Sequence, residues 1–171
     1  MLKIQPFDQP NVQQSKAETT AILKTYETTR HLPDIKPSED LVSLLAATMT
    51  NDYVAILAYL DETQELAVAL TDLRMRIANR YGIATTVGYG PKYLHSTGQF
   101  HKGGPNTGVF IIITAPVIED VTIPGEGGSF GTLIRAQAIG DLQVHQRLGH
   151  RVSHIELDQA SVEGIYGIKI D

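Results

Sequence analysis

The fold centres on the segment Gly88-Tyr-Gly-Pro-Lys-Tyr-Leu-His-Ser-Thr-Gly-Gln-Phe-His-Lys-Gly-Gly-Pro-Asn-Thr-Gly108, which the apolar run Val109-Phe-Ile-Ile-Ile-Thr114 follows directly. The segment holds six glycines, two lysines and two histidines. Glycine permits positive φ and lets backbone amides approach a ligand closely, while Lys and His supply positive charge or proton transfer. The composition fits a loop that holds an anion or a polar small molecule, and equally a long connection between two buried strands.

Buried strands are predicted on both sides of this segment. Residues 52–60 and 109–114 are near-continuous apolar runs, which are typical of strands covered on both faces. Residues 83–87 and 151–157 are predicted as two further strands.

Helices are predicted between these strands. The pattern indicates helices over residues 12–29, from Ser38 onward, and over 61–81 with Gly82 as C-cap. Ser129 is expected to cap another helix, which Gly140-Asp141 interrupts before a second helix runs to Leu148. Alternating strands and helices predict an α/β fold: a mainly parallel sheet of about four strands flanked by helices, three-layered and Rossmann-like, with an N-terminal helical arm. We expect residues 1–35 to form the arm and helix, and 36–171 a single α/β domain.

The composition of the chain argues against several classes of function. The chain has 171 residues, a formal net charge of −5 and no basic stripe, so nucleic-acid binding is not expected. It has no Cys, which excludes disulfides and thiolate metal sites. No apolar run is long enough for a membrane helix, and we expect a cytoplasmic protein without a membrane partner.

Ligands of parallel sheets bind beyond the carboxyl ends of the strands, where the glycine-rich segment begins. Candidate ligand-binding residues are therefore His95, Ser96, Thr97, Gln99 and Lys102. His95 is a candidate acid or base because loop histidines titrate near neutral pH. Lys102, beside two glycines, is read either as a phosphate ligand or as a solvated lysine.

Two other patterns are better explained without chemistry. His95 and His101 lie six residues apart, which places them on different faces of a helix, so no metal site is expected. Asp61 and Glu62 fall in the first turn of a predicted helix, where the helix dipole favours acids.

Three segments together carry a family resemblance: Pro6-Phe-Asp-Gln-Pro-Asn-Val-Gln-Gln-Ser-Lys16, residues 90–108, and Phe130-Gly-Thr-Leu-Ile-Arg-Ala-Gln-Ala-Ile-Gly-Asp141. They resemble glucose-6-phosphate isomerase, in particular the C-terminal part of the isomerase half of bacterial bifunctional transaldolase/glucose-6-phosphate isomerases. The first segment is similar to the family's Phe-(Asp/Glu)-Gln-(Pro/Trp)-Gly-Val-Glu-x-x-Lys. Asn11 stands where Gly is usual, and Gln13 where Glu is usual.

The resemblance implies an aldose–ketose isomerisation of glucose 6-phosphate and fructose 6-phosphate through an enediol, in glycolysis and gluconeogenesis, without metal or organic cofactor. It implies one catalytic residue, Lys16, similar to the family's ring-opening lysine. The segments that carry the family's Glu base, its Arg and its phosphate-binding hydroxyls are not found. The chain is therefore expected to be a C-terminal domain, inactive without the upstream sugar-isomerase domains.

Two other functions remain open. One is a non-catalytic module that binds a phosphosugar or a nucleotide through the residues 95–102. The other is a structural or assembly domain whose arm docks on a partner domain or a second subunit, which makes a homo-oligomer possible.

Overall fold

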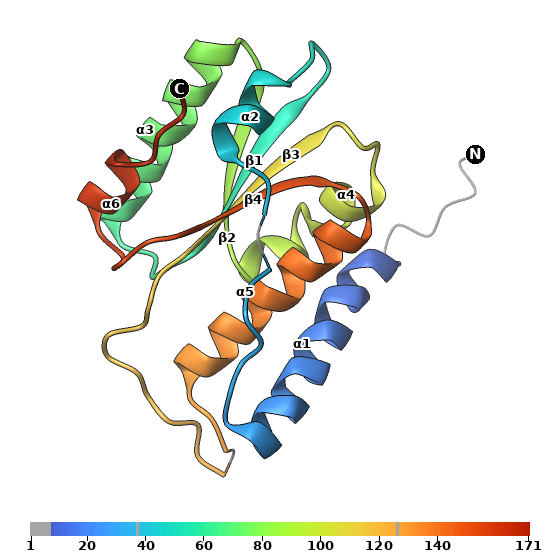
Figure 1. Ribbon diagram of the computed structural model, residues 1–171, viewed down its shortest axis with the longest axis vertical. Coiled ribbons are helices and arrows are strands. Elements are labelled where there is room, and N and C mark those ends of the chain that lie inside the picture. Colours follow the sequence, from blue (N-terminus) through green and yellow to red (C-terminus); the bar gives the residue numbers. More distant parts are fainter. Residues whose placement is uncertain (1–7, 37, 126) are drawn as a thin grey trace.

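The computed structural model describes residues 8–36, 38–125 and 127–171. Four parallel strands form one sheet in the order β2-β1-β3-β4. The strands are β1 (Tyr53–Tyr59), β2 (Ala84–Tyr89), β3 (Gly108–Thr114) and β4 (Arg151–Glu156). The predicted α/β class and parallel sheet are confirmed, and the sheet lies between two layers of helices (Figure 1).

The two central strands are apolar throughout because helices cover both of their faces. On one face, Val54 and Ile56 of β1 lie beside Val109 and Ile111 of β3, under a helix layer. That layer consists of α2 (Leu41–Ala46), α3 (Gln64–Tyr81) and α6 (Val162–Tyr166).

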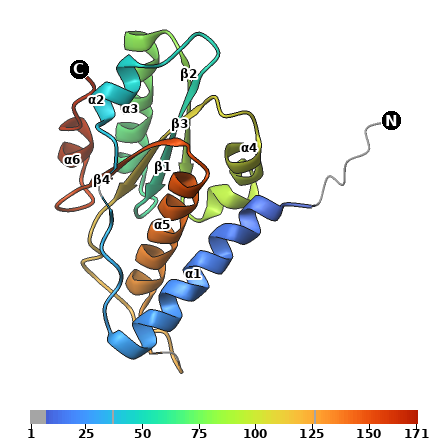
Figure 2. The ribbon, with the colours of Figure 1, turned by 45° about the vertical axis from the view of Figure 1, so that its right-hand side comes forward.

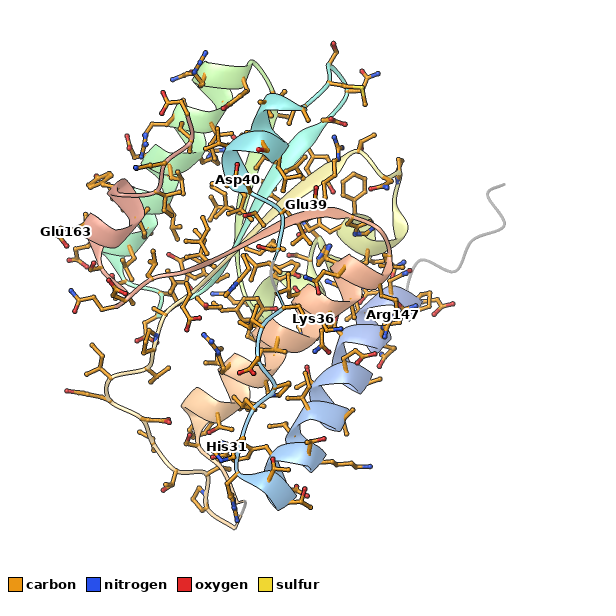
Figure 3. The ribbon with its side chains drawn as sticks, in the orientation of Figure 1. His31, Lys36, Glu39, Asp40, Arg147 and Glu163 are labelled. Atoms are coloured by element: carbon orange, nitrogen blue, oxygen red, sulfur yellow. The ribbon has the colours of Figure 1, made fainter. Side chains whose placement is uncertain are left out.

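The opposite face is covered by elements from three parts of the chain. They are α1 (Pro10–Thr29), the 3-10 helix η1 (Lys92–His95) with α4 (Gly98–Gly103), and α5 (Phe130–Arg147). Helix α5 lies on the sheet, and α1 packs on α5 through Ile22 (Figure 2). Arg147 at the end of α5 pairs with Glu18 of α1 (Figure 3).

Local sequence explains where the main helices begin and end. The Thr63 side chain accepts a hydrogen bond from the Leu66 amide at the start of α3, and Gly82 ends that helix at φ 66°. Asp40, rather than the expected Ser38, caps α2. The Ser38 hydroxyl instead accepts the amide of His154 in β4.

The predicted interruption at Gly140-Asp141 is wrong, because α5 runs unbroken from Phe130 to Arg147. Gly140 is needed for close packing: a Cβ there would lie 3.1 Å from the backbone nitrogen of Thr19 in α1. Asp141 is fully buried and therefore cannot act as an exposed helix cap.

The chain adds its second strand on one side of β1 and its third and fourth strands on the other side. From β1 the chain passes through α3 to β2 at one edge, and then through α4 to β3 on the other side of β1. The crossover helices α3 and α4 lie on opposite faces. The carboxyl ends of β1 and β3 are consequently a topological switch point, where crevices form in open α/β sheets.

Within the part of the chain described here, no helix has both the length and the apolar character that a membrane crossing requires.

Candidate functional site

A fully buried ion pair joins α4 to α5. Lys102 Nζ lies 2.7 Å from Asp141 Oδ1, and neither side chain has any exposed surface. Lys102 also donates to the Tyr93 hydroxyl at 3.0 Å, and that hydroxyl donates to Asp141. Ser15 Oγ of α1 donates to Asp141 at 3.0 Å. We call these four residues the Lys102–Asp141 cluster; it ties together segments that lie up to 126 residues apart.

The electrostatics of this cluster are self-compensating. Burial by itself raises the pKa of Asp141, but the Lys102 ammonium, with hydrogen bonds from Lys102 and Tyr93, holds that pKa below its usual value. Burial and then the Asp141 charge raise the pKa of Tyr93 well above its usual value. Asp141 is thus ionised and Tyr93 protonated at neutral pH. Each carboxylate oxygen of Asp141 has at least one donor: Ser15 and Lys102 at Oδ1, and Tyr93 at Oδ2.

Three histidine rings surround Phe110 next to this cluster. His145 and His150 share a hydrogen bond of 2.9 Å between their Nδ1 atoms, and His101 Nδ1 lies 2.9 Å from the Tyr53 hydroxyl. His145 and His150 are both buried, and His150 directly precedes β4. Burial lowers the pKa of His145 to about 3 and that of His101 to about 4, so both rings are neutral at pH 7.

These histidines do not form a metal centre. Among the residues that the structure describes, no three His, Asp or Glu side chains come together as metal ligands would.

The predicted ligand-binding residues fall into two groups. Lys102 is neither solvated nor free to bind a phosphate, because its ammonium is locked on Asp141. The Gln99 amide is engaged with Asn11: its Nε2 donates to Asn11 Oδ1 at 2.7 Å and its Oε1 accepts the Asn11 amide at 3.1 Å. His95, Ser96 and Thr97 are exposed.

Ser96 and Thr97 line a shallow hollow of about 220 Å³ beside the end of β2, together with Lys92. Tyr93 of the Lys102–Asp141 cluster also lines this hollow, but Lys102 does not, so the structure does not bring Lys102 together with the exposed hydroxyls. The predicted catalytic residue, Lys16, is exposed on α1 and directly follows the buried Ser15.

A larger crevice lies beyond the carboxyl ends of β1, β3 and β4. Two adjoining hollows of about 310 and 340 Å³ share the ring of Tyr59, the β3–α5 connection near Pro116 and the first turn of α5 near Gly131. In Figure 1 this connection extends below the sheet, and α5 begins beside it. We call the two hollows the carboxyl-edge crevice.

One hollow has a polar wall. Arg135 of α5 pairs with Glu156 through two contacts, NH1 to Oε1 at 2.7 Å and NH2 to Oε2 at 3.0 Å. Its NH1 also donates to Thr114 Oγ1 at 3.3 Å, and that hydroxyl lies 2.8 Å from His154 Nε2. The Arg135 hydrogen bond lowers the pKa of Glu156, so the positive charge of this wall is already neutralised.

The N-terminus of α5 is occupied by the chain's own carboxylate. Asp120 accepts hydrogen bonds from Ser129 Oγ at 2.5 Å and from the Gly131 amide at 2.7 Å. These bonds, the Ser129 hydroxyl first, lower the pKa of Asp120. An anionic ligand would have to displace Asp120 to use these donors.

The sequence did not indicate a ligand site at this crevice, and Asp61, which lines it, is interpreted from the sequence as a helix-terminal acid. A positional signal was available, because Tyr59, Thr114 and Glu156 are the last residues of β1, β3 and β4. Arg135 and Asp120 carry no local signal; they reach the crevice through the path of the β3–α5 connection.

Comparison with known proteins supports the fold alone. No family model matches the chain, and no curated protein matches it in sequence. Among solved structures, the hypothetical protein TT0462 from Thermus thermophilus is similar, with a TM-score of 0.60 and 20% identity. The match covers 72% of this chain and 34% of that one, so the chain spans about a third of the length of this structural relative.

Proposed function

We propose that this chain is the C-terminal domain of a glucose-6-phosphate isomerase and works with sugar-isomerase domains that bind the sugar phosphate. In this role the chain contributes Lys16 to ring opening, and it has no isomerase activity alone. Ring opening needs proton transfer at the ring oxygen, for which an exposed ammonium is suited.

One observation carries this proposal: the three segments of the resemblance meet at one buried cluster. Ser15 comes from the first segment, Tyr93 and Lys102 from the second, and Asp141 from the third. Removing one partner of a buried ion pair is strongly destabilising, so these three segments depend on one another for a stable fold. The likeness is therefore better explained as that of one folded unit than as three separate coincidences.

The cluster also accounts for how Lys16 is presented. Ser15 faces Asp141 in the interior. The next residue on a helix is rotated by about 100°, and Lys16 accordingly lies exposed on α1. Among the described residues Lys16 forms no ion pair that would hold its ammonium away from a docked domain.

A complementation assay tests this. A bacterial glucose-6-phosphate isomerase truncated before its own Phe-(Asp/Glu)-Gln segment is mixed with the chain, and fructose 6-phosphate formation is followed in a coupled assay. We expect activity only in the mixture and a loss of about 100-fold with Lys16→Ala, which is the scale of general acid–base catalysis. Lys24→Ala, another exposed lysine of α1, is the matched control and should leave the activity unchanged.

Two results would contradict the proposal. One is Lys16-dependent isomerisation by the chain alone, which would place a base within these residues. The other is complementation that Lys16→Ala does not reduce.

A further inference from the structure

The carboxyl-edge crevice has the position and size of a ligand site. It lies at the topological switch point of a parallel sheet, the place where ligands bind in open α/β folds. Its two hollows, of about 310 and 340 Å³, adjoin one another. Small-molecule sites are typically of this size, largely apolar, with a few placed polar groups.

The outer half of the crevice is apolar and open to solvent. Phe130 is 56% exposed, Val121 62% and Val117 39%, and all three line the second hollow. Exposed large side chains are ordinary when they occur singly, but a group around a cavity marks a binding surface. A ring placed against Phe130 would remove apolar area from water on both partners.

The charged groups of the crevice disfavour an anion. Four carboxylates line it (Asp61, Glu119, Asp120 and Glu156), against one guanidinium, Arg135, which Glu156 already neutralises. A phosphate would meet unpaired carboxylates here, and the amide donors of α5 are occupied by Asp120. A hydroxyl or amino group, in contrast, can donate to these carboxylates.

We propose that the carboxyl-edge crevice binds a small, ring-bearing molecule that is neutral or positively charged and that donates hydroxyl or amino hydrogens to the carboxylates. The ring lies against Phe130 and Val121, and the donors face Asp61 and Glu119. This site is separate from Lys16 and does not depend on the proposed isomerase role. It takes a ligand class that excludes sugar phosphates.

Three probes with one ring and different charges test the proposal: benzylamine, benzyl alcohol and benzoate. Binding to the full chain is followed by NMR titration at low salt, with amide resonances of residues 115–121 and 130–135 as the readout. We expect benzylamine and benzyl alcohol to shift these resonances. The crevice holds three more carboxylates than guanidinium groups. Benzoate should therefore bind at least about sevenfold more weakly than benzylamine, because a single carboxylate about 7 Å away in water already gives that ratio for a change in ligand charge from +1 to −1.

Substitutions test the apolar half and the charged half of the site independently. Phe130→Ala should weaken the binding of all three probes. Glu119→Gln combined with Asp61→Asn should instead reduce the difference in affinity between benzylamine and benzoate. All three side chains are exposed, so these changes should leave the fold intact. Asp72→Asn, an exposed acid of α3, is the control that should change neither. Shifts by none of the probes, shifts mapping elsewhere, or equal binding of benzoate would overturn the proposal.

Discussion

Replacing Asp141 by asparagine should destabilise the protein severely while changing almost none of its volume. The substitution leaves the Lys102 ammonium buried without a counterion. At the observed 2.7 Å and an effective dielectric constant of about 20, the attraction that is lost is about 6 kcal/mol. The single amide oxygen can replace only one of the two carboxylate oxygens, which accept from Ser15 and Tyr93 separately, so one of these hydrogen bonds is lost together with the charge.

Relaxation of the surroundings of the unpaired ammonium recovers part of this attraction. We therefore expect the free energy of unfolding to fall by about 3–5 kcal/mol, which in a chain of this size lowers the Tm by about 10 °C. Urea unfolding followed by circular dichroism measures the first quantity, and a thermal scan the second.

A pH series distinguishes this explanation from a simple packing defect. In the wild type the pKa of Asp141 is held below its usual value, first by the Lys102 ammonium, so the stabilisation by its charge is present above the unfolded pKa of about 3.9 and is lost as the pH falls through the folded pKa. The deficit of the variant relative to the wild type should then shrink on acidification. A packing defect would show no such slope.

The double variant Lys102→Met/Asp141→Asn completes the cycle. Removing both charges leaves no uncompensated ion, so most of the lost stability should return. Lys92→Met is the control, because its pair with Glu62 is exposed and should contribute below about 1 kcal/mol. A loss under about 1 kcal/mol for Asp141→Asn, or a double variant no more stable than the single one, would refute the reasoning.

Three further predictions concern other parts of the fold. Because burial holds the folded pKa of His145 at about 3, stability should fall as the pH drops below the unfolded value of about 6.5, and His145→Gln should flatten this slope in urea unfolding between pH 7 and 4.5. Gly140→Val should push α1 from α5, since a Cβ at residue 140 lies 3.1 Å from Thr19; we expect a loss of about 1–3 kcal/mol, and unchanged stability would contradict the close packing. Because the hydrogen bond from Arg151 lowers the pKa of Asp52, that pair should stabilise the fold above about pH 4 and lose its effect on acidification, so Asp52→Asn should destabilise at pH 7 but little at pH 2.5.

The sheet could be predicted from sequence because burial on both faces leaves a local signature. The runs of residues 52–60 and 109–114 are apolar without alternation, and the structure makes them the two central strands. Gly82 ends α3 as predicted, whereas the helix begins at Gln64 after the Thr63 cap, so Asp61 and Glu62 precede it rather than forming its first turn. In each case the interaction that decides the structure is local.

The sequence-based predictions are wrong where the environment of a residue depends on a partner that is distant in the sequence. Gly140-Asp141 has the composition of a helix break, yet the partners of these residues are Thr19 on another helix and Lys102 on α4. Lys102 itself stands beside two glycines, as a phosphate ligand would, and nothing nearby in the sequence indicates Asp141. A buried charge is specified by its counterion, and the counterion here lies 39 positions away in the sequence.

Tyr59 links the two parts of the molecule that carry our proposals. Its ring lines both hollows of the carboxyl-edge crevice, while its hydroxyl is buried; burial and then the Asp141 charge raise its pKa well above the usual value. Ala138 of α5 likewise lines the crevice and packs in the core against the same face of the sheet. The Lys102–Asp141 cluster thus lies behind the floor of the crevice, and its charge reaches the Tyr59 hydroxyl, which has no hydrogen-bond partner among the described residues. A loss of that ion pair should loosen the floor and weaken probe binding, even though no residue of the pair lines the crevice.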